Sequence, residues 1–239
     1  MSSGIYSALS GARTRMEMLD TISHNMANVS TSGFKKGRAT FEAALSEAQS
    51  GNGTQGINFA QIRGGFTDFS PGLITHTGQT FDLAIAAEGF FKVQDEQGNT
   101  FFTRQGNFMR DTDGYLKIGD RFMLLDDGDQ PVMVEGNTIN IAEDGTIQMD
   151  EQTGAKIALY QVDETQLERV SGSFFRLQGD NAPLLENGKI MQGQLEQSNI
   201  NIMQEMVRMI ETMRVFETSQ RAIKNFDNLR SKMNEIGTL

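Results

Sequence analysis

Few side chains in this sequence could perform catalysis or hold a metal ion. The chain of 239 residues has no cysteine and two histidines, His24 and His76, which excludes thiol nucleophiles, thiolate metal sites and histidine-rich metal sites. The acidic clusters at 111–113 and 126–129 lack the distal glutamate of a calcium-binding EF-hand loop. We interpret both clusters as hairpin turns, and the sequence predicts a protein that is not an enzyme and has no metal and no cofactor.

The charge balance narrows the range of partners. The formal net charge is -10 at pH 7, and an acidic chain is repelled by phosphate backbones and anionic lipid surfaces. We therefore expect no nucleic acid and no small-molecule substrate as partners. The first 20 residues lack the apolar segment of a secretory signal peptide, and no apolar run approaches the ~20 residues that span a bilayer. If the protein leaves the cytoplasm, we expect export without a cleaved signal peptide.

Both ends of the chain have the residue spacing of long amphipathic helices. Apolar residues recur there at alternating intervals of three and four, as in a coiled-coil seam. The N-terminal seam passes through Ile22 or Ser23, and Gln220 interrupts the C-terminal one. We predict an assembly interface formed by Ile5, Leu9, Met16, Leu19, Ile22, Met26 and Val29 in the first helix and Ile202, Met206, Met209, Met213, Phe216, Ile223 and Phe226 in the second.

The middle of the chain follows a different pattern. Short apolar runs are separated by glycine and aspartate turns at 97–99, 113–114 and 127–128, which favours an antiparallel sandwich or a partly open barrel. A stretch rich in Gly, Gln and Asn precedes these runs and is typical of a flexible or extended connector. The predicted segments are an N-terminal assembly helix at 1–34, a connector at 35–72, a central β domain at 73–197 and a C-terminal assembly helix at 198–239.

These patterns together predict a mainly β fold with long terminal α-helices. The N- and C-terminal helices would pair as a coiled coil, and the central antiparallel β domain would be inserted between them. A lone pair of helices buries too little apolar surface to offset its ordering entropy comfortably. The sequence therefore indicates assembly with further partners, and the 14 methionines suit a surface that packs against several neighbours.

Three blocks of the sequence resemble those of one known protein family. The first, LDTISHNMANVSTSGFKKGRATF, spans 19–41; the second, TGQTFDLAIAAEGFFKVQ, spans 77–94; the third, which begins GQLEQSNINIMQEM, spans 193–227. In content and order they are similar to the blocks of bacterial flagellar rod and hook proteins. The residues carried over as family-motif positions are Asn25, Ala27, Asn28, Thr31, Gly33, Phe34, Asp82, Gly89, Phe90, Phe91, Ser198, Asn199, Glu205, Arg214 and Glu217.

The resemblance implies a structural subunit of the flagellar rod. Such a protein polymerises into a hollow helical tube that spans the periplasm and transmits torque from motor to hook. Its implied partners are itself, other rod proteins and the flagellar type III export apparatus. The size of the chain and its single β domain are similar to those of both the proximal-rod and the distal-rod type. The short connector and the runs at 138–149 and 156–161 favour the proximal-rod type, with the distal-rod type as the alternative. Two other classes stay open: a β-rich oligomeric binding module, such as a phage-tail-like or adhesin component, and a carboxylate-based hydrolase using Asp111, Asp113 or Asp126.

Overall fold

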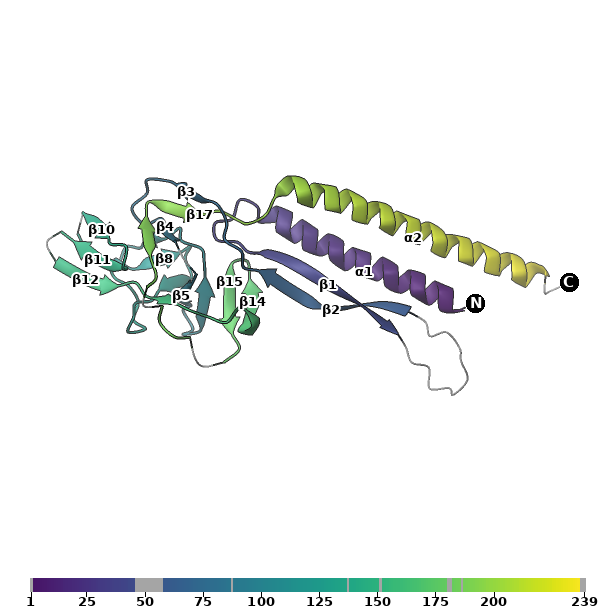
Figure 1. The fold of residues 1–239 in the computed structure, drawn as a ribbon, viewed down its shortest axis with the longest axis horizontal. Coiled ribbons are helices and arrows are strands. Elements are labelled where there is room, and N and C mark those ends of the chain that lie inside the picture. Colours follow the sequence, from purple (N-terminus) through teal and green to yellow (C-terminus); the bar gives the residue numbers. More distant parts are fainter. Residues whose placement is uncertain are drawn as a thin grey trace. The chain divides into compact units, whose positions relative to one another are not determined.

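The computed structural model describes residues 2–45, 58–86, 88–136, 138–150, 152–179, 182–185 and 187–236. Within these ranges the chain forms two compact units (Figure 1). The helical unit comprises Met1–Ala27, Gly37–Asp68 and Asn201–Leu239, and the β-rich unit comprises Asn28–Lys36 and Phe69–Ile200. The chain thus enters the β-rich unit twice and leaves it twice.

The helical unit is built from two helices and a hairpin. Its elements are α1 (Ser2–Ala27), β1 (Lys36–Leu45), β2 (Asn58–Asp68) and α2 (Ile202–Ile236). The Asn201 side chain caps α2, since its Oδ1 accepts from the Gln204 amide at 3.2 Å. Strands β1 and β2 pair with each other, and α1 contacts both α2 and β2. In the part of the chain that the structure describes, neither helix is long and apolar enough to cross a membrane.

The predicted fold class is wrong. There is a single helix at each end, and α1 contacts the β1–β2 hairpin as well as α2, so the two helices are not a coiled coil flanking one β domain. The strands are also divided between the two units. Both hairpin strands lie in the stretch at 35–72 that we interpreted as a connector. Gly, Gln and Asn have weak strand preference, so the composition of this stretch concealed the hairpin.

The β-rich unit consists of short antiparallel strands. In chain order these are β3 (Ile74–His76), β4 (Leu83–Ile85), β5 (Phe90–Gln94), β6 (Thr100–Thr103), β7 (Met109–Arg110), β8 (Leu116–Ile118), β9 (Phe122–Leu124), β10 (Ile139–Ile141), β11 (Thr146–Met149), β12 (Gln152–Lys156), β13 (Leu159–Tyr160), β14 (Leu167–Ser171), β15 (Phe174–Leu177), β16 (Ile190–Gln192) and β17 (Gln194–Glu196). A short 3₁₀ helix at Glu164–Gln166 precedes β14.

The strands pair into several sheets. The largest has the order β14-β15-β6-β5-β9-β8-β7, and β13 pairs with β5 off this path. Strands β10, β11 and β12 form a three-stranded sheet, and β16 pairs with β4 and β17 with β3. The last two pairs join segments that lie more than 100 residues apart in the sequence, with Ile190 opposite Ile85 and Glu196 opposite Ile74.

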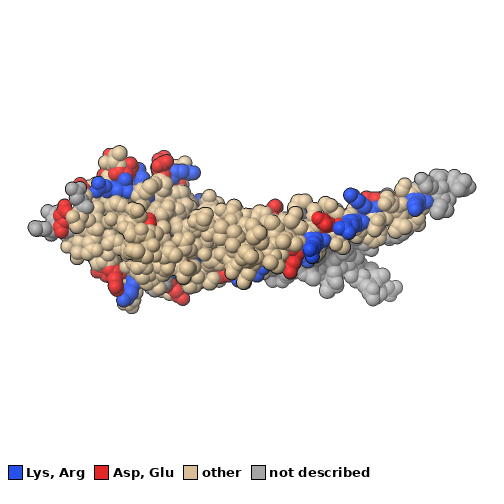
Figure 2. All heavy atoms as spheres, turned by 90° about the horizontal axis from the view of Figure 1, so that it is seen from above, with Lys and Arg blue, Asp and Glu red and all other residues tan. Residues whose placement is uncertain are grey.

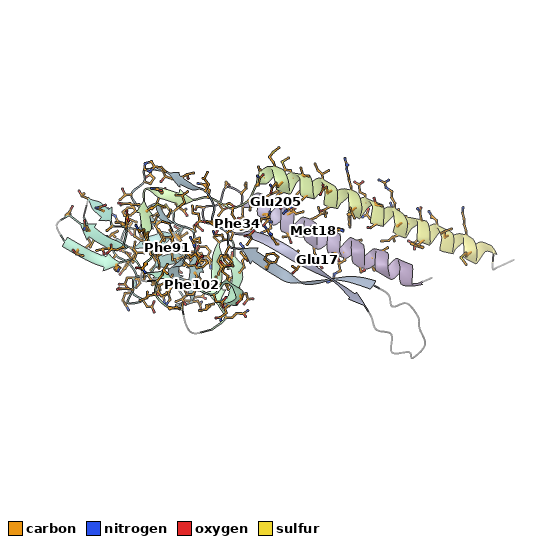
Figure 3. The ribbon with its side chains drawn as sticks, in the orientation of Figure 1. Glu17, Met18, Phe34, Phe91, Phe102 and Glu205 are labelled. Atoms are coloured by element: carbon orange, nitrogen blue, oxygen red, sulfur yellow. The ribbon has the colours of Figure 1, made fainter. Side chains whose placement is uncertain are left out.

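Two apolar clusters fill the β-rich unit. The larger is centred on residues such as Phe91, Leu116 and Leu124, all fully buried, and the smaller on Phe102 and Phe175 (Figure 3). Full burial of one Leu or Phe side chain stabilises by about 1.5–3 kcal/mol. A core of this size gives the β-rich unit its own source of stability.

Candidate assembly surface

One face of α2 packs within the helical unit. Glu205 and Thr212 are almost completely buried on this face, and seven residues separate them, which is close to two helical turns. The Thr212 hydroxyl approaches the Met18 sulfur of α1 at 3.7 Å, and Figure 3 marks both Met18 and Glu205. Arg208 donates to the Glu205 carboxylate at 3.0 Å. Polar and small groups thus occupy much of the face that a coiled-coil seam would fill with apolar side chains.

The opposite side of α2 carries exposed apolar side chains. Successive residues of an α-helix are rotated by about 100° around its axis. Five of the exposed apolar side chains therefore fall within an arc of about 120° on the side of α2 that faces away from Thr212. We call this set the outer face; it comprises Met203, Met206, Val207, Ile210 and Met213. Each is between 45% and 68% exposed. Figure 2 looks at α2 from above and shows few charged side chains over its first turns, with more of both signs farther along.

The predicted seam residues divide between these environments. Ile22 is buried, and Leu19, Met26, Met209, Phe216 and Ile223 are half-buried. Leu9, Met16, Ile202, Met206, Met213 and Phe226 are exposed. Val29 is half-buried within the β-rich unit, and the side chain of Ile5 lies outside the described part of the structure. Among the described residues, the predicted set therefore includes buried, half-buried and exposed side chains, and its role in assembly stays a prediction.

Sequence reasoning missed three members of the outer face. Met203, Val207 and Ile210 were not predicted, although the last two follow Met203 at intervals of four and seven. That spacing is a second amphipathic stripe. The predicted seam merges this stripe, through Met206 and Met213, with the half-buried stripe through Met209 and Phe216.

A buried ionic cluster lies where the chain enters and leaves the β-rich unit. The Lys35 ammonium donates to Glu196 Oε1 at 2.6 Å and to the Ser70 carbonyl oxygen at 3.0 Å. Arg104 donates to Glu196 Oε2 at 3.3 Å, and the Gly72 amide donates to Oε1 at 2.9 Å. The side chains of Lys35 and Glu196 are 1% and 2% exposed. One carboxylate therefore serves two cations and a backbone amide in a site shielded from solvent.

Burial controls the electrostatics of this cluster. Desolvation lowers the pKa of the Lys35 ammonium, and the nearby Glu196 carboxylate opposes that effect. Burial lowers the pKa of Arg104 in the same way, again against the pull of Glu196. Arg169 stacks on the Phe34 ring at 4.7 Å, and burial lowers its pKa to about 10. The cluster is a structural arrangement of charges rather than a reactive centre, because each charged group is engaged by other groups of the same unit.

Backbone bonds align the entering and leaving segments beside the cluster. The Gly33 amide donates to the Glu196 carbonyl at 2.7 Å, and the Lys36 amide donates to Asn199 Oδ1 at 2.8 Å. Gly33 has a φ of 64°, and a Cβ there would lie 2.3 Å from the carbonyl carbon of Arg104. Only glycine fits this left-handed position. The turn that follows α1 is therefore held by sterics as well as by hydrogen bonds.

The other family-motif residues hold similar structural positions. Asn25 is buried and bonds both the amide and the carbonyl of Gly37 at 2.9 Å. Asp82 accepts from Thr77 at 2.6 Å, and its carbonyl accepts from the Gly193 amide at 2.7 Å. The remainder differ in exposure: Phe34, Gly89, Phe90, Phe91 and Glu205 are buried, Asn28, Thr31, Ser198 and Asn199 half-buried, and Ala27, Arg214 and Glu217 exposed.

The residues considered for chemistry lie in turns or on the surface. Asp126 Oδ1 accepts from the Gly128 and Gln130 amides at 2.9 and 2.8 Å, and Asp111 accepts from the Thr112 amide at 2.7 Å. His24 and His76 are both exposed. Across the described ranges, no group of three or more acidic, histidine or cysteine side chains is placed to hold a metal ion.

Comparison with known proteins adds to this geometry. Residues 191–236 match the family model for the flagellar basal body rod FlgEFG protein C-terminal region, and residues 84–149 match that for the flagellar hook protein FlgE/F/G D1 domain. The flagellar basal-body rod protein FlgF of Mesorhizobium japonicum is 30% identical over 92% of this chain and 91% of its own length. FlgF of Caulobacter vibrioides is 29% identical over 100% of both chains, and FlgG of Bacillus subtilis is 29% identical over 98% of both.

The chain belongs to the flagellar basal-body rod protein family. It is a structural subunit of the rod, located in the flagellar basal body, where it assembles with other basal-body components. The C-terminal family match covers α2 and its outer face, and the other match covers the core strands β4 to β11.

Proposed function

We propose that this chain is a proximal-rod subunit that polymerises through the helical unit into the hollow tube of the rod. The tube spans the periplasm and transmits torque from motor to hook, and the subunit reaches it through the flagellar type III export apparatus. The observation that carries the proposal is the outer face of α2. It places five apolar side chains in solvent, although the same helix has a second face that is already packed.

The energetics favour occupation of this face by another subunit. Removal of apolar surface from water stabilises by about 25 cal/mol per Å², so an exposed stripe of Met, Val and Ile is a strong driving force for association. Head-to-tail contacts that do not close generate open helical assemblies. Methionine adapts to neighbours of different shape, which suits a subunit that meets both copies of itself and other rod proteins.

The alignments support the proximal position. The relatives named FlgF align with few gaps, since 224 positions cover 92% of this chain and 245 positions cover all of it, whereas the Bacillus relative named FlgG needs 260 positions to cover 98%. The ionic cluster supports torque transmission, because it ties the segments around Lys35, Ser70 and Glu196 to one another within the β-rich unit. A subunit under mechanical load needs these segments to keep their positions. A distal position is the alternative that the relatives named FlgG support.

The absence of cysteine permits a direct crosslinking test. A single cysteine at Met206 or Ile210 in otherwise wild-type cells is expected to form crosslinks to basal-body proteins, identified by mass spectrometry. Asp113→Cys provides the matched control, since this residue is exposed on a turn of the β-rich unit. If the two α2 positions crosslink no more than the control, polymerisation through the outer face is contradicted.

A second experiment tests the position in the rod. Cells arrested after the proximal rod has formed should contain the chain in their purified basal bodies. Its absence from those particles, together with its presence in complete rods, would contradict the proximal position and support the distal one.

A further inference from the structure

The outer face of α2 contains three exposed thioethers. Met203 is 68% exposed, Met213 49% and Met206 45%, and all three lie on the same side of the helix. The structure gives other methionine sulfur atoms polar contacts: Met18 with the Thr212 hydroxyl at 3.7 Å and Met149 with the Glu135 amide at 3.1 Å. The three outer-face methionines share one side of α2, whereas Met233, which is 51% exposed, lies near the end of the helix and outside this face.

The composition of the chain directs oxidation to methionine. There is no cysteine and no tryptophan, so no thiol competes for a two-electron oxidant. Hydrogen peroxide transfers one oxygen atom to the thioether sulfur, which is oxidised to the sulfoxide, while the peroxide is reduced to water. The product has no added net charge, but it converts a flexible apolar side chain into a polar one.

The position of these thioethers on the outer face determines how their oxidation affects assembly. A sulfoxide that becomes buried between subunits loses its hydrogen bonds to water. Its neighbours on the outer face, Val207 and Ile210, are apolar and donate no hydrogen bond in return. Three sulfoxides along about three helical turns would impose this penalty repeatedly at one interface. An exposed sulfoxide on the free subunit keeps its water, so the fold of the monomer is unaffected.

We propose that Met203, Met206 and Met213 form an oxidation site that controls assembly. Peroxide converts them to sulfoxides in the free subunit and blocks polymerisation, and methionine sulfoxide reductases restore it. Incorporation into the rod covers the thioethers and protects them. This inference rests on the proposed function of the outer face.

The test uses the purified full-length chain treated with hydrogen peroxide. Peptide mass spectrometry measures the sulfoxide at each methionine, and sedimentation velocity measures self-association. We expect sulfoxide at the three outer-face positions, unchanged circular dichroism and at least a tenfold weaker association. Treatment with both sulfoxide reductases, one for each epimer, should restore association.

Two variants with leucine in place of methionine distinguish oxidation of the outer face from oxidation elsewhere in the chain. Met203→Leu/Met206→Leu/Met213→Leu keeps an apolar face without sulfur and should associate equally well before and after peroxide. Met109→Leu/Met133→Leu removes two exposed methionines of the β-rich unit, which are 57% and 40% exposed, and should remain peroxide-sensitive. Equal sensitivity of the triple variant and the wild type would overturn the inference, and so would normal association of a wild-type chain oxidised at all three positions. Failure of the untreated chain to associate would instead contradict the proposed function.

Discussion

Both units of this protein bury a carboxylate, Glu196 in the β-rich unit and Glu205 in the helical unit, but they differ in how they place apolar surface. In the β-rich unit a carboxylate and two cations are buried together, and aliphatic and aromatic side chains fill the core. In the helical unit apolar side chains of α1 and α2 face solvent, among them Leu9, Met16 and the outer face. A unit that is complete by itself can use buried charges to select one geometry, whereas a unit that assembles keeps apolar surface available for a neighbour.

The comparison separates two kinds of family-motif residue. Gly33, Asn199 and Asp82 make internal contacts of the β-rich unit, so their role is to define the subunit. Arg214 and Glu217 lie exposed on α2 beyond the methionine stripe, where they are available to other molecules. We expect substitutions of the first kind to alter stability and substitutions of the second kind to alter assembly alone.

The largest effect is expected from breaking the buried ionic cluster. Lys35→Met leaves Glu196 without its shortest ion pair and should lower the free energy of unfolding by about 3–5 kcal/mol, the range found when one partner of a buried pair is removed. Lys189→Met is the matched control, because its ion pair with Glu143 is exposed, and it should change stability by about 0–1 kcal/mol. Urea denaturation measures both, and similar values would show that burial does not strengthen the pair.

Gly33 offers a second way to disturb the β-rich unit. Gly33→Ala should lower the free energy of unfolding by about 2–4 kcal/mol, because strain at positive φ adds to a backbone clash. Gly119 has a φ of 58°, and a Cβ added there would meet no atom within 4 Å, so Gly119→Ala should cost only the strain, about 1–2 kcal/mol. Thermal unfolding of the two variants isolates the contribution of the close approach to Arg104. Equal losses would mean that the turn shifts to accommodate the methyl group.

A charge introduced on the outer face of the helical unit should weaken self-association and leave the stability of the monomer almost unchanged. Ile210→Asp should change monomer stability by less than about 0.5 kcal/mol, as for other surface positions, yet weaken self-association tenfold or more because a carboxylate would be buried at the interface. Gln204→Asp adds the same charge at an exposed position about 120° around the helix from Ile210 and is the control. Sedimentation velocity compares the two, and equal association would remove Ile210 from the interface.

The smallest effect concerns the pH dependence of the cluster. Because burial lowers the pKa of Lys35 below 10.5, the unfolded chain binds more protons than the folded one between the two pKa values. The stability of the wild type relative to Lys35→Met should therefore rise as the pH increases through that window. Unfolding measured at about pH 8 and about pH 10.5, which bracket the window below the ordinary lysine pKa, checks the sign. A fall in relative stability would mean that attraction by Glu196 outweighs desolvation.

Local pattern predicted the elements better than their packing. Terminal helices and aspartate–glycine turns follow from periodicity and turn chemistry, as at Asp113 and Asp126. The β1–β2 hairpin was not predicted, because the Gly, Gln and Asn of this stretch indicated a connector. The two faces of α2 were merged into one seam for a similar reason, since spacing alone does not reveal which side packs.

The ionic cluster was beyond the reach of sequence patterns. Lys35 and Glu196 are separated by 161 positions, and each has an ordinary neighbourhood in the sequence. The basic run of Lys35, Lys36 and Arg38 has the local pattern of a solvated helix end, but the side chain of Lys35 is only 1% exposed. The motif blocks contained both partners, but the resemblance gave no physical reason why a lysine and a glutamate were required.

Burial of the outer face in the assembled rod is the central claim. A single cysteine introduced by Val207→Cys can be labelled with a maleimide in the purified monomer and in isolated basal bodies, with Asp113→Cys as reference. We predict rapid labelling of position 207 in the monomer and labelling at least tenfold slower in the rod, while position 113 reacts at similar rates in both. Equal labelling of position 207 in monomer and rod would contradict the claim that α2 assembles through this face.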